Sequence, residues 1–426
     1  MLDVKRLREA PEEARRRLAR RDDPEVLDQL DRVLELDRRR RDLIGDVEAL
    51  RAERNESSER IGELKRQGED ASGLIEEMRE VKARIDELDE ELDGVEDELH
   101  EILLAIPNFP DERVPEGGED AYEVLEEHGE RPEFDFEPRP HWELGEELGI
   151  LDLERGARLA GSGFPVLRGA GARLQRALAA FMMDVHVEEH GYREVAPPYL
   201  VDRDSMTATG HLPKFERDAY RTEPDDLFLI PTAEVPVTNL HGGEILDAGT
   251  LPLHYVAYTP CFRREAGSAG RDTRGMLRVH QFDKVELVRL ERPEDSEAAL
   301  EELTGHAETV LERLGLPWRR ILLPTGDLGF GNAITYDLEV WSAGVGEWLE
   351  VSSCSLYGDY QARRAGVRYR PAPGRGPEYA HTLNGSGVAL ARTLVALLEN
   401  GQRADGSVEL PGALHPYAGR ERIGAP

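Results

Sequence analysis

The sequence predicts an α+β protein, with an N-terminal antiparallel two-helix coiled-coil arm followed by a domain that has an antiparallel β-sheet flanked by helices. Residues 26–104 carry apolar side chains at alternating steps of three and four, which is the period of a coiled coil. The strand-like segments 253–265 and 278–290 then follow one another directly, which favours an antiparallel sheet. The segments expected to form the flanking helices are 171–192, 296–315 and 388–401.

The arm prediction depends on two seams, 33–64 and 74–102, separated by a turn. The segment RQGEDASG between them contains Gly68 and Gly73, which we expect to end one helix and reverse the chain. Each helix would be about 45–60 Å long at about 1.5 Å per residue. We assign residues 1–110 to this arm. A purely structural coiled coil, or a rod that mediates dimerisation, is the alternative interpretation of the same pattern.

Charge is distributed unevenly along the arm. Residues 1–70 hold 18 Lys and Arg against 20 Asp and Glu, whereas residues 71–140 hold 6 against 25. A first helix that is rich in arginine suits an elongated, phosphate-bearing partner gripped from the side. The candidate side chains for that edge are Arg38, Arg39, Arg40, Arg41, Arg51, Arg54, Arg60, Lys65 and Arg66.

The remainder of the chain, residues 111–426, is assigned to one further domain. Residues 105–140 are rich in proline, glycine and acidic side chains, and they predict a linker with entry loops. Gly401 is the expected stop of the last long helix. A strand entry is expected at 192–201, and further strands are expected at 333–342 and 347–355.

Composition restricts the class of protein. The formal net charge is −33, and lysine supplies only 5 of the 54 basic side chains. An acidic protein that repels nucleic acid is one interpretation. The scarcity of lysine favours another, a halophilic source, because concentrated salt shortens the Debye length to about 3 Å at 1 M and leaves a nucleic-acid partner possible. Only Cys261 and Cys354 occur, and neither a membrane span nor a secretion signal is present, so we expect a cytoplasmic protein.

The stretch FRREAGSAGRDTRGMLRVHQF concentrates five arginines in this acidic chain. The period of two in a strand places Arg263 and Glu265 on one face and Arg264 on the other. Arg278 and Phe282 share a face of the returning strand. Guanidinium groups suit phosphate oxygens and an aromatic ring suits a stacked base, so a nucleotide would bind on an antiparallel sheet. An arginine-rich surface hairpin is the alternative.

Four segments, in order, resemble motifs of the class II aminoacyl-tRNA synthetases, and specifically of the bacterial-type seryl-tRNA synthetase family. HGYREVAPPYLV is similar to motif 1, with Pro198 as its proline, and TPCFRREAGSAGRDTRGMLRVHQFDKVEL is similar to motif 2. NGSGVALARTLVALLEN resembles motif 3, and PTAEVPVTNLHGGEIL resembles the serine-specific Thr-Ala-Glu segment. Together with the arm, the resemblance covers essentially the whole chain. Residues 356–358, Leu-Tyr-Gly, depart from the family pattern, and we expect that departure to affect a local surface.

The resemblance implies a set of ligand contacts. Arg263 would contact the α-phosphate and the serine carboxylate, and Arg392 the γ-phosphate; these two are the expected catalytic residues. Glu265 would bind the adenine amino group and Phe282 would stack on adenine. Arg271 and Arg274 lie in the loop where the tRNA acceptor end would arrive. The implied ATP contacts are Arg263, Arg264, Glu265, Val279, Phe282, Glu350, Val351, Ser352, Ser353 and Arg392. The implied serine contacts are Thr232, Ala233, Glu234, Glu286 and Ser386.

The resemblance also implies an activity and partners. A serine–tRNA ligase would use ATP with Mg²⁺ held through Glu350 and Ser353, and no zinc is expected. Its partners would be L-serine, ATP and tRNA(Ser), with tRNA(Sec) open as a second acceptor, in a homodimer without a membrane. Two alternatives remain: a paralogue that loads a carrier protein, and a coiled-coil binding module with a degenerate synthetase domain.

Overall fold

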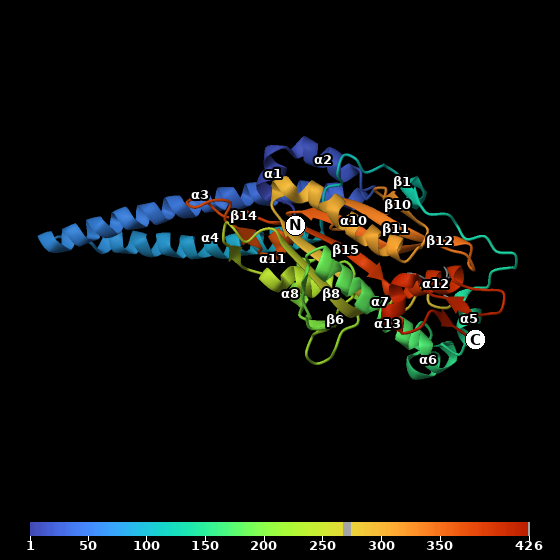
Figure 1. The fold of residues 1–426 in the computed structure, drawn as a ribbon. Coiled ribbons are helices and arrows are strands. Elements are labelled where there is room, and N and C mark those ends of the chain that lie inside the picture. The colour runs from blue at the N-terminus through green and yellow to red at the C-terminus, as the bar shows by residue number, and fades with distance from the viewer. Residues whose placement is uncertain (267–273, 425–426) are drawn as a thin grey trace. The chain divides into compact units, whose positions relative to one another are not determined.

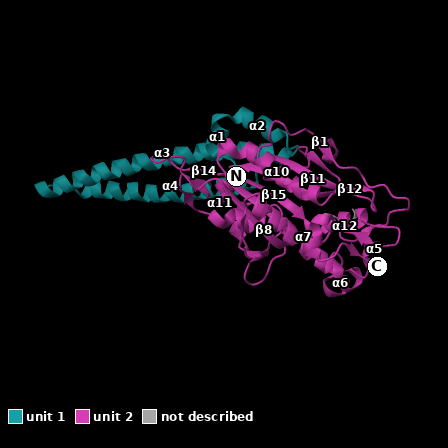
Figure 2. Ribbon diagram, in the orientation of Figure 1, with its two compact units in different colours: residues 1–107 teal, residues 108–426 magenta. Residues whose placement is uncertain are grey.

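The computed structural model describes residues 1–266 and 274–424. The chain divides into two compact units, residues 1–107 and residues 108–426, which Figure 2 shows in different colours. The first unit is helical, and the second is a mixed but mainly antiparallel sheet flanked by helices (Figure 1), which confirms the predicted α+β class. Within the described ranges, no helix combines the length and apolar composition that a membrane span requires.

Two long helices dominate the first unit. They are α3 (Pro24–Gln67) and α4 (Ser72–Ala105), and they pack side by side as the predicted antiparallel pair (Figure 1). The shorter helices α1 (Val4–Glu9) and α2 (Pro11–Ala19) pack on α3. The seam follows the predicted 3.5-residue period. Its buried side chains are Val33, Leu36, Leu43 and Val47 on α3 and Ile85, Leu88 and Leu99 on α4.

The turn between α3 and α4 depends on one glycine. Gly68 caps α3 with a φ of 74°, in the left-handed region that favours glycine, and its N–H bonds to carbonyls of the last helical turn. Gly73, which was expected to act as a second breaker, lies inside the first turn of α4. Its flexibility is therefore not what reverses the chain.

Several arginines expected to line a phosphate-binding edge pair with acidic side chains of α4 instead. Arg39 pairs with Glu91, and the Nε of Arg40 lies 2.7 Å from Glu96 Oε1. The Nη2 of Arg51 lies 2.8 Å from Asp89 Oδ2. Such exposed pairs contribute little individually to the pairing of the helices, because water and salt screen the charges. In the part of the chain that the structure describes, no carboxylate lies within ion-pair distance of Arg38, Arg60 or Lys65, all of which are exposed.

The second unit is built on an eight-stranded sheet in the order β1-β10-β11-β12-β15-β9-β8-β4. Every neighbouring pair is antiparallel except the short pair of β4 and β8. The strands are β1 (Glu123–His128), β4 (Arg193–Glu194), β8 (Leu253–Phe262), β9 (Gln281–Glu291), β10 (Trp318–Leu322), β11 (Ile334–Ser342), β12 (Glu347–Gly358) and β15 (His381–Ala389). Consecutive hairpins β8–β9 and β11–β12 confirm the sheet type that the sequence predicts.

Three helices pack on the sheet: α7 (Ala170–Asp184), α10 (Ser296–Arg313) and α12 (Leu390–Asn400). Their apolar side chains share one core with alternate residues of the strands, including Val285 and Leu287 of β9. Because side chains alternate along a strand, Lys284 and Glu286 point to the opposite face. The sheet therefore has one face that anchors it and one face that carries charge.

The other elements are short and connect these layers. The helices are α5 (His141–Glu147), α6 (Leu153–Ala160), α8 (Arg203–Ala208), α9 (Glu234–Thr238), α11 (Tyr360–Ala365), α13 (His415–Ala418), the π-helical turn η2 (Val185–Glu189) and the 3₁₀ turns η1 (Glu119–Ala121), η3 (Glu216–Asp218), η4 (Asn239–His241), η5 (Pro293–Asp295) and η6 (Gly412–Leu414). The strands are β2 (Leu151–Asp152), β3 (Val166–Leu167), β5 (Leu200–Val201), β6 (Phe228–Leu229), β7 (Ile245–Leu246), β13 (Arg368–Tyr369), β14 (Glu378–Tyr379), β16 (Val408–Glu409) and β17 (Arg422–Ile423).

Three local predictions were met only in part. The expected linker contains β1, an edge strand whose side chains are all exposed, so no apolar alternation marked it. Residues 192–201 contain two separate two-residue strands, β4 and β5, which pair with β8 and β6 in different sheets, and Pro197 and Pro198 lie between them. Gly401 caps α12 and ends it as predicted, but its φ of −85° is not the left-handed conformation expected of a C′ glycine. A Cβ there would lie 2.4 Å from the carbonyl oxygen of Glu409, so close packing explains this glycine.

The turn η2 places a buried histidine beneath β15. His186 Nε2 lies 2.9 Å from the Gly387 carbonyl oxygen, and His186 Nδ1 lies 3.0 Å from Nδ1 of His190. A carbonyl only accepts, so His186 Nε2 carries a hydrogen and donates it to Gly387. A Cβ on Gly387 would lie 2.5 Å from His186 Nε2, so the glycine is required by this contact. Burial lowers the pKa of His186 to about 3.

Replacing His186 by Gln should make stability less dependent on acid pH. Between the unfolded pKa of 6.5 and the folded pKa of about 3, the unfolded chain binds a proton that the folded chain excludes. His186 therefore makes the free energy of unfolding fall by about 1.4 kcal/mol for each pH unit below about 6.5. Urea unfolding at several pH values should give a shallower slope for His186→Gln than for the parent or for His100→Gln, a substitution at an exposed site. Equal slopes in all three proteins would refute this role.

Candidate active site

A cavity of about 230 Å³ opens on the charged face of the sheet. It is lined by side chains from β9, β12, β15 and α12 and from the loops around them. The structure brings most of the predicted site residues together here. Those that line the cavity are Thr232, Glu234, Arg263, Glu265, Val279, Phe282, Glu286, Glu350, Val351, Ser353, Ser386 and Arg392.

Three predicted residues lie outside the lining. Ala233 is buried directly before α9. Ser352 is also buried, and its hydroxyl donates to the carbonyl oxygen of Ser386 at 2.6 Å, so it supports the cavity wall from behind. Arg264 lines a separate hollow together with Lys214, Arg217 and Arg221. Its backbone N–H donates to the carbonyl of Asp218, and its side chain lies away from those of Arg263 and Glu265, as the strand period predicts.

The structure describes only one of the two arginines, Arg271 and Arg274, that were expected in the loop near the tRNA acceptor end. Arg274 is described, and its guanidinium carbon lies 4.7 Å from the centre of the Trp142 ring. Arg271 lies outside the described residues. The contact of Arg274 with Trp142 ties the end of the loop to α5.

One end of the cavity holds two buried carboxylates. Thr232 Oγ1 donates to Glu286 Oε2 at 3.0 Å, and Lys284 forms an ion pair with the same carboxylate. Gln361 Nε2 donates to Glu234 Oε1 at 2.7 Å. The other end of that amide, Gln361 Oε1, accepts from Thr382 Oγ1 at 2.6 Å, which fixes the orientation of Gln361.

Burial controls the electrostatics of this end. It raises the pKa values of both Glu234 and Glu286, and hydrogen bonding from Gln361 and the charge of Lys284 oppose that rise. Two carboxylates face a single ammonium group, so the end has one negative charge in excess when both acids are ionised. A small ligand with its own ammonium group would supply the missing positive charge, and a hydroxyl would suit the remaining oxygens.

The other end of the cavity is rich in arginine. The guanidinium carbon of Arg263 lies 5.2 Å from the centre of the Phe282 ring. Arg278 Nη1 donates to Glu265 Oε2 at 2.6 Å. Arg392 Nη1 donates to the backbone carbonyl of Glu350 at 2.8 Å and to its carboxylate at 3.1 Å.

This end carries a positive excess, because three guanidinium groups face the carboxylates of Glu265 and Glu350. Partial burial opposes ionisation of Glu350, but the charges of Arg392 and Arg263 outweigh it and hold the pKa of that carboxyl below its ordinary value. The Oγ of Ser353 donates to Glu350 Oε1 at 3.2 Å. Planar guanidinium groups beside an aromatic ring suit a polyphosphate that is attached to a stacked base.

A metal ion in this cavity would need further oxygen atoms from a bound substrate. Among residues 1–266 and 274–424, no group of three or more His, Cys, Asp and Glu side chains is placed to hold a metal ion. Glu350 and Ser353 offer two adjacent oxygen ligands, the type that Mg²⁺ prefers, and Mg²⁺ is commonly completed by phosphate oxygens and water.

Sequence reasoning missed several residues of the cavity. Lys284 lies two positions before Glu286 on the same strand face, and its rarity in this chain was a usable signal. Gln361 does not line the cavity but supports Glu234 from behind, and it had no signal because it comes from the short helix α11 and is fully buried. The departure at residues 356–358 was expected to affect a surface. Instead, Tyr357 is buried, lines the cavity and accepts a hydrogen bond from Asn384 Nδ2 at 3.1 Å.

Two family models match the chain. The model described as tRNA synthetase class II core domain (G, H, P, S and T) matches residues 214–401. The model described as Seryl-tRNA synthetase N-terminal domain matches residues 1–110. The first contains the cavity, and the second contains the paired helices α3 and α4.

Full-length relatives and solved structures agree with these models. The chain is 55% identical to a serine–tRNA ligase of Exiguobacterium sp. over 100% of both chains, and 57% identical to one of Geobacillus sp. over 99% of this chain and 100% of the other. Seryl-tRNA synthetase from Pyrococcus horikoshii complexed with ATP is 37% identical, with a TM-score of 0.95 over 99% of both chains. The cytoplasmic serine–tRNA ligase of Naegleria fowleri in complex with AMP is 28% identical, with a TM-score of 0.89 over 99% of this chain and 98% of the other.

Proposed function

The chain belongs to the seryl-tRNA synthetase family of serine–tRNA ligases, and we propose that its cavity binds serine at the Glu234–Glu286 end and ATP at the arginine end. The observation that carries this proposal is the opposite charge excess of the two ends. The acidic end complements an ammonium group, and the basic end complements a triphosphate. Serine and ATP bound in this way would meet between the ends, beside Arg263.

The reaction follows from that placement. A carboxylate oxygen of serine attacks the α-phosphorus of ATP, the bond to pyrophosphate breaks, and seryl-adenylate forms. A terminal ribose hydroxyl of the tRNA then attacks the seryl carbonyl carbon, and AMP leaves. Neither step needs a side-chain nucleophile, so the protein contributes position and charge stabilisation. Bound Mg²⁺ would supply additional charge neutralisation on the phosphates.

Individual side chains have distinct roles in this scheme. Arg263 neutralises the charge that develops on the α-phosphate, and Arg392 holds the γ-phosphate. Phe282 stacks on adenine, and the Glu265 carboxylate accepts a hydrogen bond from the adenine amino group. Glu350 and Ser353 would hold the Mg²⁺ ion that is bound to the phosphates. Thr232 and Glu286, already joined by a hydrogen bond, bind serine together with Glu234 and Ser386. A site that pairs a small hydroxyl rejects alanine, because its buried polar groups would lose a partner.

The assembly and the partner follow the same family pattern. We propose a cytoplasmic homodimer that uses residues 192–201; the exposure of Tyr199 (47%) and Leu200 (43%) supports a contact there. The partner is tRNA(Ser), with tRNA(Sec) as a candidate second acceptor. The helical arm would recognise the tRNA by shape and backbone. The acidic surface would keep the protein hydrated in a salt-rich cytoplasm.

Arg263→Ala should reduce serine-dependent ATP–pyrophosphate exchange by about 10²–10³-fold, the loss seen when one donor to a developing charge is removed. Arg264→Ala is the matched comparison, because the structure places that side chain in a different hollow. Exchange by Arg264→Ala should stay within about twofold of the parent, as is usual for residues away from a site. Near-normal exchange by Arg263→Ala would remove the proposed role.

Gln361→Leu should weaken serine without weakening ATP. Loss of the donor to Glu234 raises the pKa of that carboxyl further above its ordinary value, so more of it is protonated and unable to pair with an ammonium group. The KM for serine should rise about tenfold, and the rise should grow as pH falls. The KM for ATP, measured in the same exchange assay, should not change. A parallel rise in both KM values would contradict a specific role at the serine end.

The arm offers a comparison between unpaired and paired cations. The triple variant Arg38→Ala, Arg60→Ala, Lys65→Ala removes exposed side chains that have no ion-pair partner within the described ranges. The KM for tRNA should rise about tenfold, with a smaller dependence on salt, because phosphate contacts are lost.

The control for the arm is the double variant Arg39→Ala, Arg51→Ala, whose side chains are already neutralised by Glu91 and Asp89. It should affect the stability of the helix pair more than the KM for tRNA. Serine-dependent exchange should be unchanged in both variants. A larger effect on tRNA from the ion-paired set would show that this edge does not contact phosphate.

A further inference from the structure

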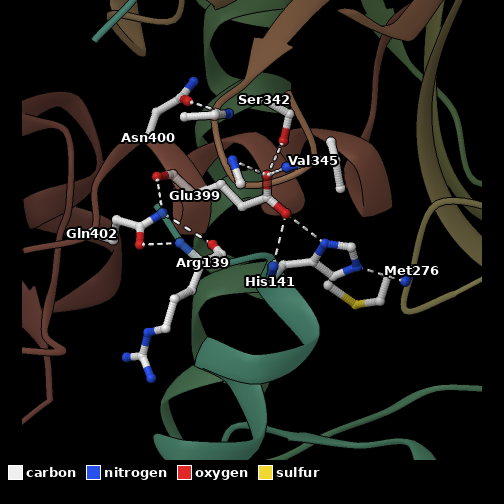
Figure 3. A network of polar contacts seen from close by, with 10 residues as sticks. Arg139, His141, Met276, Ser342, Val345, Glu399, Asn400 and Gln402 are labelled. Carbon is white, nitrogen blue, oxygen red and sulfur yellow. Dashed lines mark hydrogen bonds and ion pairs between the residues drawn. The ribbon is translucent and has the colours of Figure 1, made fainter. Parts of the chain in front are cut away.

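A buried carboxylate near the end of α12 organises the wall behind the ATP end of the cavity (Figure 3). Glu399 is fully buried, and its Oε1 accepts from the backbone N (2.7 Å) and from Nδ1 (2.8 Å) of His141. Its Oε2 accepts from Ser342 Oγ at 2.6 Å and from the backbone N–H groups of Gly344 and Val345 at 2.8 and 2.9 Å. Five donors therefore stabilise the ionised form, and they hold the pKa of Glu399 below its ordinary value despite its burial.

The second nitrogen of the His141 ring reaches the returning end of the arginine-rich loop. The backbone N–H of Met276 donates to His141 Nε2 at 2.9 Å. Since Nε2 accepts and Nδ1 faces a carboxylate, the ring is neutral with its hydrogen on Nδ1. Gly275 has a φ of 72°, and a Cβ there would lie 2.1 Å from His141 Nε2. This glycine is therefore required by the close approach of the imidazole as well as by its backbone conformation.

The backbone just before His141 is held by Gln402, which follows the C-terminal end of α12. Gln402 Oε1 accepts from the backbone N–H of Arg139 at 2.8 Å, and Gln402 Nε2 donates to the Arg139 carbonyl at 3.0 Å (Figure 3). The residue two positions before His141 is thus paired through both of its backbone polar groups. The imidazole is held at its base as well as at both ring nitrogens.

The segment that follows Met276 carries one wall of the cavity. Met276, Leu277, Arg278 and Val279 all line it. The carbonyl of Leu277 accepts from Arg392 Nε at 3.1 Å, while Arg392 Nη1 donates to Glu350. Arg392 and Glu399 are seven residues apart on α12 and therefore lie on the same face of that helix. The helix holds the returning segment at two points: through His141 at Met276, and through Arg392 at Leu277.

We propose that His141 is a positioning residue for ATP: together with Glu399 it holds the Met276–Leu277 backbone against α12 and so sets the Leu277 carbonyl that orients Arg392. His141 is fully buried and lines no part of the cavity, so it acts through Arg392 and not by touching a substrate. The inference rests on the proposed role of Arg392 at the γ-phosphate. The serine end is supported separately by Gln361 and Thr382, so a fault at His141 acts on one substrate only.

The test is a split between the two KM values. His141→Asn retains a short donor for Glu399 and leaves the Met276 N–H without an acceptor. In ATP–pyrophosphate exchange, the KM for ATP should rise about tenfold, equivalent to about 1.4 kcal/mol, and kcat should fall, while the KM for serine stays within about twofold. Titration of active sites by the burst of adenylate gives the fraction of folded enzyme.

A second variant distinguishes a loss of positioning from misfolding. Gly275→Ala pushes the Met276 amide away from the ring without altering the buried carboxylate, and it should give the same split between ATP and serine. Adding His141→Ala to Gly275→Ala removes the clashing ring, so the two effects on the KM for ATP should be less than additive. Additive effects would show that the two residues act independently and would overturn the proposal.

The matched control is Asn400→Ala. Asn400 adjoins Glu399, accepts from the Ala343 N–H at 3.1 Å and donates to the Trp341 carbonyl at 2.7 Å, but it has no bond to the returning segment. It should lower thermal stability and leave both KM values unchanged. A His141→Asn protein that behaves like Asn400→Ala would reduce His141 to a structural residue. If Arg392→Ala itself leaves the KM for ATP unchanged, the fault lies in the proposed ATP site.

Discussion

The register of β9 is the constraint on which both the core and the cavity depend. Its odd and even positions divide between the helix-packed face, with Val285 and Leu287, and the charged face, with Lys284 and Glu286. A slip of one residue would put an ammonium and a carboxylate into an apolar core and expose the leucine. Both neighbours secure the register: β8 pairs along the whole strand, and β15 sets Ser386 opposite Glu286. The proposed serine pocket and the sheet core are therefore specified by one pairing.

Periodic features were predictable because they repeat. The coiled-coil seam and the β8–β9 hairpin follow from apolar spacing, and most of the implied ligand contacts converge on one cavity. Features set by a single tertiary contact were not predictable. The edge strand β1 carries no alternation, the buried Gln361 comes from the short helix α11, and the contact that Gly401 makes with the Glu409 carbonyl is not marked by the helix-end pattern. In each case the partner is distant in sequence or lies outside any repeating pattern.

The positions of the charged side chains explain more about this protein than its net charge does. On α3, arginines such as Arg39 and Arg51 are neutralised by acids of α4, so these basic side chains form ion pairs within a chain whose net charge is −33. In the cavity the charges do not balance locally: one end has a negative excess and the other has a positive excess. An incomplete pair in a partly buried site is costly unless a ligand completes it, and that cost favours the ligand with the missing charge.

The two ends of the cavity are also supported by separate sets of buried hydrogen bonds. At the Glu234–Glu286 end, Gln361 connects Glu234 to Thr382, so α11 and β15 fix the position of that acid. At the arginine end, Glu399 and His141 connect α12 to the returning loop. Neither set shares a residue with the other. Because the two sets are separate, a substitution that loosens one of them is expected to shift the binding of one of the two proposed substrates while the other stays in place.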